Sequence, residues 1–97
     1  MSFSSFIEPR RRGFIVALLA QSGEQGANVP LVVSITQNAG YRASADVIKA
    51  DLAALRDLGL LTLREIGTLQ MARIEQRGRD FAGGQFDVPG LERVGDV

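Results

Sequence analysis

Residues 44–78 constrain the fold of this chain more than any other stretch. They contain a helical pattern, a stop at Gly59, and two short alternating segments joined by a turn at Gly67. The apolar positions of the helical pattern fall on one face: Ile48, Leu52 and Leu55. Glycine tolerates the left-handed backbone conformation that ends many helices. The pattern therefore predicts a helix over 44–58 that is followed directly by a β-hairpin.

The segments 61–65 and 69–74 alternate between apolar and polar residues, which is typical of the two strands of a hairpin. A short helix is expected after them, from about residue 75 to 82. Two consecutive glycines follow this helix. We therefore predict one domain over 1–83 and an extended or partly disordered tail over 84–97.

Two more helices are expected upstream of this region. The first begins at Pro9, because proline suits a first helical turn, and the second is capped by Asn28 and runs to Gly40. Ser44 caps the helix over 44–58. The predicted fold class is mainly α with a small β-hairpin, in the order α-α-α-β-β-α. This is the order of a winged helix-turn-helix, which mostly holds one helix in the DNA major groove.

The composition excludes several kinds of site. The chain of 97 residues has no cysteine and no histidine, so zinc ligands, thiol nucleophiles, imidazole bases and disulfides are absent. We expect no enzyme, no cofactor and no metal. The longest apolar run, 14–20, is shorter than the roughly 20 residues of a membrane span. A cytoplasmic protein fits these properties.

The helix over 44–58 and the turn before it are the main candidate for contact with double-stranded DNA. The residues expected to face the DNA are Arg42, Ser44, Ala45, Asp46, Lys49 and Ala53. The alternative is a solvated helix face on an ordinary helical bundle. Three acidic residues of this helix, including Asp51, oppose two basic ones, and the formal net charge of the chain is zero. Both facts lower the expected affinity for phosphates.

The run Arg10, Arg11 and Arg12 is the only basic cluster in the sequence. It could hold phosphates that flank a DNA site. Alternatively, it is a solvated helix start that is neutralised by Glu8 or Asp51.

The hairpin offers Arg64 as a contact to the DNA backbone, and Arg73 on the return strand. Its tip is not basic, which is unfavourable for DNA. Ile66 at this exposed turn indicates instead a contact with another protein surface.

Phe3, Phe6 and Ile7 repeat at helical spacing near the N-terminus. They predict a short helical extension that packs on the core or on a second subunit. We expect these three side chains to form the interface of a homodimer.

The stretch from "DVIKADLAALRDLGLL" to "EIGTLQMARIEQRG" is similar to the winged-helix core of ArsR/MarR-like bacterial regulators. Over nearly the whole chain, the sequence resembles the small winged-helix proteins of Mu-like phages and prophages. That resemblance depends on Phe3, Phe6, Arg11, Leu58 to Leu61, Glu65 to Leu69 and Val88 to Gly90. It implies a winged-helix fold and a role in transcription regulation through DNA binding. The lack of cysteine and histidine excludes the metal sensing of some ArsR members.

Two functions remain open at this point. The first is a phage or prophage transcriptional regulator that binds DNA as a homodimer. The alternative is a non-enzymatic adaptor or assembly module that contacts a phage or host protein and does not bind DNA. A DNA-binding protein should join its basic residues into one exposed face, whereas an adaptor should have them scattered or paired with carboxylates.

Overall fold

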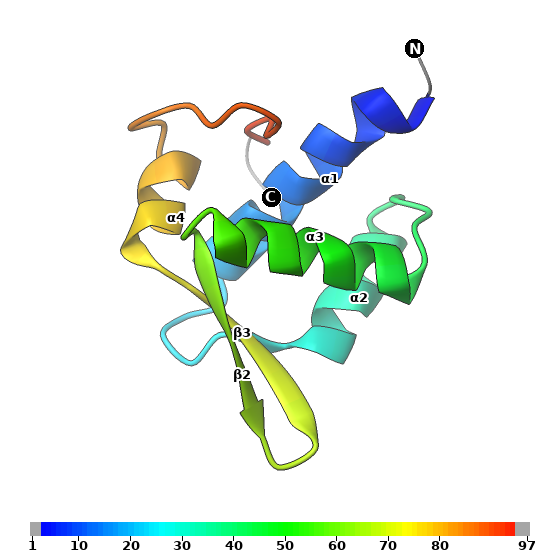
Figure 1. Cartoon of the computed structure of the whole chain (residues 1–97), viewed down its shortest axis with the longest axis vertical. Helices are drawn as coiled ribbons and strands as arrows, with labels where there is room; N and C mark the ends of the chain where they lie inside the picture. Colours follow the sequence, from blue (N-terminus) through cyan, green and yellow to red (C-terminus); the bar gives the residue numbers. More distant parts are fainter. Residues whose placement is uncertain (1–2, 95–97) are drawn as a thin grey trace.

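The computed structural model describes residues 3–94, with side chains from residue 6 onward, as four helices and a three-stranded antiparallel sheet. The helices lie around the sheet, and one hairpin projects from the body of the molecule (Figure 1). In chain order the elements are α1 (Phe3–Ala20), β1 (Ala27–Asn28), α2 (Val29–Asn38), α3 (Ala45–Asp57), β2 (Leu61–Ile66), β3 (Leu69–Ile74) and α4 (Gln76–Ala82).

Helix α1 starts at Phe3, six residues before the predicted start at Pro9, and continues through the proline. The predicted N-terminal extension is therefore part of one long helix. Proline lacks an N–H group, so it removes a single hydrogen bond to the preceding turn. The helix tolerates this loss here, and the proline does not mark the helix start.

The two predicted N-caps are confirmed. The Asn28 side chain accepts a hydrogen bond from the Leu31 backbone N–H at 2.7 Å, and the Ser44 hydroxyl accepts one from the Val47 N–H at 3.2 Å. Each cap satisfies one of the backbone donors that a helix start leaves free. Gly59 ends the α3 region with a φ of 77°, as expected for a left-handed helix stop.

The predicted hairpin is confirmed, with Leu61 opposite Ile74 and Ile66 opposite Leu69. The sheet also contains a strand that the sequence did not predict. The two residues of β1 pair with β3, so that the strand order is β1-β3-β2. Gly26 makes this pairing possible, because a Cβ at this position would lie 2.1 Å from the Ala72 carbonyl oxygen. A two-residue strand has no alternation to reveal it.

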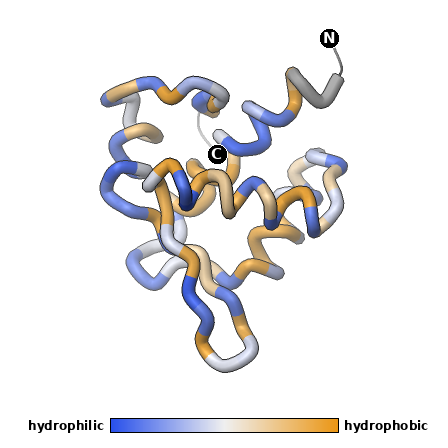
Figure 2. The backbone as a smooth tube through the Cα atoms, in the orientation of Figure 1, coloured by the Kyte–Doolittle hydropathy of each residue, from blue (hydrophilic) through white to orange (hydrophobic). Residues whose placement is uncertain are grey.

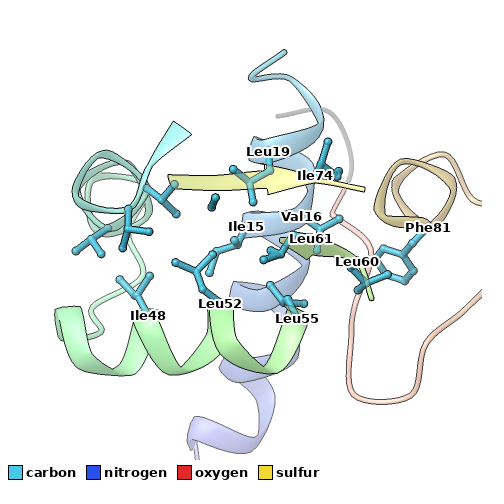
Figure 3. Packing of buried hydrophobic residues seen from close by; sticks show 14 of the residues in the cluster. Ile15, Val16, Leu19, Ile48, Leu52, Leu55, Leu60, Leu61, Ile74 and Phe81 are labelled. Atoms are coloured by element: carbon cyan, nitrogen blue, oxygen red, sulfur yellow. The ribbon is translucent and has the colours of Figure 1, made fainter. Parts of the chain in front are cut away.

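The hydrophobic core lies between α1, α3 and the inner face of the sheet (Figure 3). Ile15 and Leu19 of α1 and Leu52 of α3 belong to this core, and all three side chains are fully buried. The remaining large core residues are Ile48, Leu55, Leu60, Leu61, Ile74 and Phe81. Each such side chain contributes about 1.5–3 kcal/mol relative to an exposed one. This core fixes α3 against α1 and leaves the opposite side of α3 in solvent.

Residues 84–94 form neither helix nor strand, but they pack on the domain. Val88 is buried in the core, and the Phe86 ring lies 6.2 Å from that of Phe81. The Glu92 N–H donates to the Pro9 carbonyl at 3.1 Å, which attaches the tail to α1. The last three residues of the predicted tail lie outside the described part of the chain.

Candidate nucleic-acid interface

The outer side of α3 carries the largest share of the predicted DNA-contacting residues. Asp46 and Lys49 are exposed on it, next to the small side chains of Ala50 and Ala53. Within residues 3–94, no carboxylate lies at ion-pair distance from Lys49. This side of the helix is therefore narrow and mixed in charge, with a lysine that is free to meet an anion.

Arg42 lies exposed in the connection between α2 and α3, close in sequence to the start of α3. The connection is held in place, because the Gln37 side-chain amide donates to the Ala43 carbonyl at 2.9 Å. The Tyr41 ring also packs 5.2 Å from the Phe14 ring of α1. Arg42 thus extends from a fixed backbone and has no ion pair in the described part of the chain.

Two of the predicted DNA-contacting residues, Ser44 and Ala45, make contacts within the domain. The Ser44 hydroxyl is used by the helix cap. Ala45 is half-buried and packs against the core. Ala45 lies three residues before the buried Ile48, so its side chain is on the core side of α3 and not on the outer side.

The arginine run in α1 does not form an exposed phosphate site. Arg11 is buried. Its Nε atom donates to the Asp51 Oδ2 atom, and its Nη2 atom donates to the Asp51 Oδ1 atom at 3.1 Å. Arg12 donates through Nε to Asp51 at 2.9 Å, and its Nη2 lies 2.6 Å from Glu8. Both guanidinium groups are therefore occupied within the domain, which favours the alternative that Glu8 and Asp51 neutralise this run.

Asp51 is the centre of this network and is only 1% exposed. Its hydrogen bonds raise the pKa of the Arg11 guanidinium above the ordinary value, although burial opposes the shift. From the sequence alone, Asp51 was expected to be one of the acidic groups that oppose DNA binding. Its carboxylate instead faces α1 and is neutralised by two arginines, so it does not add charge to the outer side of α3.

Arg10 remains on the surface, with its Nε atom 3.6 Å from the Glu92 carboxylate. Both side chains are more than half exposed. An ion pair of this kind contributes little. Arg10 is reachable from solvent, but it is already opposed by a carboxylate and lies on α1, apart from the outer side of α3.

Arg64 is exposed in β2, two residues before the strand ends at Ile66. It borders a hollow of about 280 Å³ whose lining residues are Glu24, Gln25, Arg64, Ile66, Met71 and Arg73. From the sequence, Arg64, Ile66 and Arg73 were expected at a binding surface, but Glu24, Gln25 and Met71 were not. The alternation within the strands could have shown that Arg64, Met71 and Arg73 share one face of the hairpin. The loop at Glu24 lies next to this face only because β1 pairs with β3, and β1 was not predicted.

The predicted dimer residues differ in their surroundings. Phe6 is 61% exposed near the start of α1, whereas Ile7 is half-buried. The side chain of Phe3 lies outside the described part of the structure. The N-terminal part of α1 extends from the body of the molecule, so Phe6 is open to a partner (Figure 1).

Among the described residues, no group of three or more acidic, cysteine or histidine side chains is placed to hold a metal ion. None of the helices in residues 3–94 has the length and apolar character needed to cross a membrane.

The chain matches no protein-family model, and comparisons with curated proteins and with solved structures give no significant match.

Proposed function

We propose that this chain is a winged helix-turn-helix protein that binds double-stranded DNA through α3. The order of the elements supports this fold: α2 and α3 form a helix pair joined by a short fixed connection, and the β2–β3 hairpin follows as the wing. The resemblance to small proteins of Mu-like phages and prophages is consistent with it. On this proposal the protein is a phage or prophage transcriptional regulator that acts in the cytoplasm and has no enzymatic activity or cofactor.

The outer side of α3 is the observation that carries this proposal. A helix with its side chains is about 10–12 Å across and fits the major groove, which is about 12 Å wide. Ala50 and Ala53 permit a close approach of the helix backbone, and Lys49 and Arg42 supply positive charge that has no ion pair within residues 3–94. The burial of Asp51 removes one of the acidic groups that would oppose such a contact.

Two cations per chain give only weak binding, because each phosphate contact contributes a modest, salt-dependent amount. A homodimer would double the number of contacts and place two α3 helices on half-sites about one helical turn apart. The exposed Phe6 side chain supports a dimer formed through the N-terminal part of α1. Phe6→Asp should then give a folded monomer. A variant that remains dimeric at micromolar concentration would disprove this interface.

The DNA proposal is tested by the double variant Arg42→Ala/Lys49→Ala. The affinity for DNA fragments is measured over a series of salt concentrations. The slope of log affinity against log salt should become shallower by about 0.9 for each lost contact, or about 1.8 per chain. An unchanged affinity and slope would show that this surface does not bind DNA.

A second function is favoured by a specific observation. Arg11 and Arg12 are held by Asp51 within the domain, so only Arg10 of the single basic cluster remains exposed, beside Glu92. Ile66 is 57% exposed at the end of the hairpin. Both properties suit a protein-interaction module that does not bind DNA, such as an adaptor or assembly factor.

A further inference from the structure

The hairpin has two faces of different character. Side chains alternate between the two faces of a strand, and residues directly opposite each other share a face. Arg64 lies opposite Met71, and Ile66 lies opposite Leu69, so these four side chains are on one side of the sheet. This outer hairpin face consists of Thr62, Arg64, Ile66, Leu69, Met71 and Arg73. The opposite face includes Leu61, Ala72 and Ile74, which are buried in the core.

The outer hairpin face exposes apolar side chains that no described part of the protein covers. Ile66 is 57% exposed, Leu69 is 42% exposed, and Met71 is half-buried between them and the rest of the sheet. Figure 2 shows that apolar residues extend into the projecting end of the hairpin. Since Ile66 and Leu69 are directly opposite each other, their side chains form a continuous apolar surface.

A preformed hollow lies on this face. Glu24 and Gln25 border it on one side, and the two strands border it on the other. The loop is held in position because β1 pairs with β3 and Gly26 fits closely against the Ala72 carbonyl. The backbone around the hollow is therefore held in place by the fold, and the volume of about 280 Å³ is large enough for an apolar side chain of a partner.

The two arginines of the outer hairpin face also line this hollow. Arg64 and Arg73 have no ion pair within residues 3–94, although Glu24 borders the same hollow. Two guanidinium groups beside an apolar surface favour a ligand that carries carboxylates next to aliphatic or aromatic groups.

We propose that the outer hairpin face binds an acidic and apolar segment of another protein. Its carboxylates pair with Arg64 and Arg73, and an apolar side chain enters the hollow against Met71. A phosphate backbone fits this face less well, because the exposed apolar side chains of Ile66 and Leu69 gain nothing from phosphate. The inference goes beyond the proposed DNA contact of α3 and gives a partner class to the protein-interaction function.

The test is a selection of peptides from a random library displayed on phage, with the full chain as the target. Selected peptides are synthesised, and their affinities are measured for the wild type, for Arg64→Ser/Arg73→Ser, and for Arg42→Ala/Lys49→Ala. The last two variants lose the same charge from different surfaces. Circular dichroism shows whether each variant remains folded, and DNA binding is measured separately for all three proteins.

We expect the selected peptides to combine Asp or Glu with large apolar residues. They should bind Arg64→Ser/Arg73→Ser about tenfold more weakly and Arg42→Ala/Lys49→Ala unchanged. The proposal is overturned if no peptide is enriched, if the two variants bind the peptides equally, or if Arg64→Ser/Arg73→Ser loses DNA binding instead. A failure of the α3 proposal gives a different result, since it affects only DNA binding.

Discussion

The arginines of α1 and those of the outer hairpin face contact very different surroundings. In α1, three consecutive arginines lie beside Glu92, Asp51 and Glu8, and the central one is buried. On the hairpin, Arg64 and Arg73 are nine residues apart in sequence but line one hollow, with no ion pair in the described part of the chain.

This difference shows that a cluster of charges in the sequence does not measure the charge available to a partner. The carboxylate that neutralises Arg11 is 40 residues away in the chain and is brought there by the packing of α3 on α1. Burying such a pair requires that each charge keeps its partner, because the loss of solvation is several kcal/mol per ion. Arg11 and Arg12 therefore hold α1 against α3, whereas Arg64 and Arg73 stay exposed on the hairpin.

The largest predicted effect concerns Asp51. Asp51→Ala leaves the buried Arg11 guanidinium without its partner, so the free energy of unfolding should fall by about 3–5 kcal/mol. Urea denaturation measures this change. The matched control is Asp46→Ala in the exposed first turn of the same helix, which should lower stability by at most about 1 kcal/mol through the helix dipole. Equal effects of the two variants would contradict the structural role of Asp51.

The second prediction concerns both members of the buried pair. Arg11→Met combined with Asp51→Leu replaces the ion pair by apolar side chains of similar volume. Such replacements are often neutral or stabilising, so the double variant should regain most of the roughly 3–5 kcal/mol that Asp51→Ala loses. Thermal and urea unfolding test this. A double variant no more stable than Asp51→Ala would mean that the charges, and not the filled volume, are needed at this crossing.

Ser44 should have an intermediate effect. Ser44→Ala removes the hydroxyl that accepts from the Val47 N–H, and the loss should be about 1 kcal/mol in unfolding free energy. Ser34→Ala, on the exposed side of α2, is the matched control and should not destabilise the protein. A similar result for both serines would show that the cap is not significant.

The smallest effect is expected for Arg10. Its ion pair with Glu92 is exposed, so Arg10→Ala should change the free energy of unfolding by less than about 0.5 kcal/mol. The salt dependence of DNA binding should also stay the same. A shallower salt dependence of DNA binding for Arg10→Ala would show that Arg10 contacts DNA, and that the arginines of α1 are not all occupied within the protein.

Local signals in the sequence predicted much of the fold. Asn28, Ser44 and Gly59 have roles that depend on a few neighbouring residues, and the structure confirms all three. The hairpin was likewise evident from alternation within its own strands. These features are predictable because their physical causes lie within one or two turns of the chain.

Features that depend on distant contacts were missed. Strand β1 exists because β3, more than 40 residues later, supplies its partner. The Arg11–Asp51 pair is of the same kind, and the sequence could only name Asp51 as one possible neutraliser. The hollow on the outer hairpin face could not be predicted either, because its lining depends on the register of β2 and β3 and on the position of the loop at Glu24.

The most direct test of the account is the binding of pooled bacterial and phage genomic DNA fragments at low and near-physiological salt. The wild type and Arg42→Ala/Lys49→Ala are compared in parallel. If α3 binds DNA, the wild type should retain selected fragments at both salt concentrations, and the variant should lose them as salt rises. No retention by the wild type at either concentration, or equal retention by the variant, would contradict the proposal that α3 binds DNA.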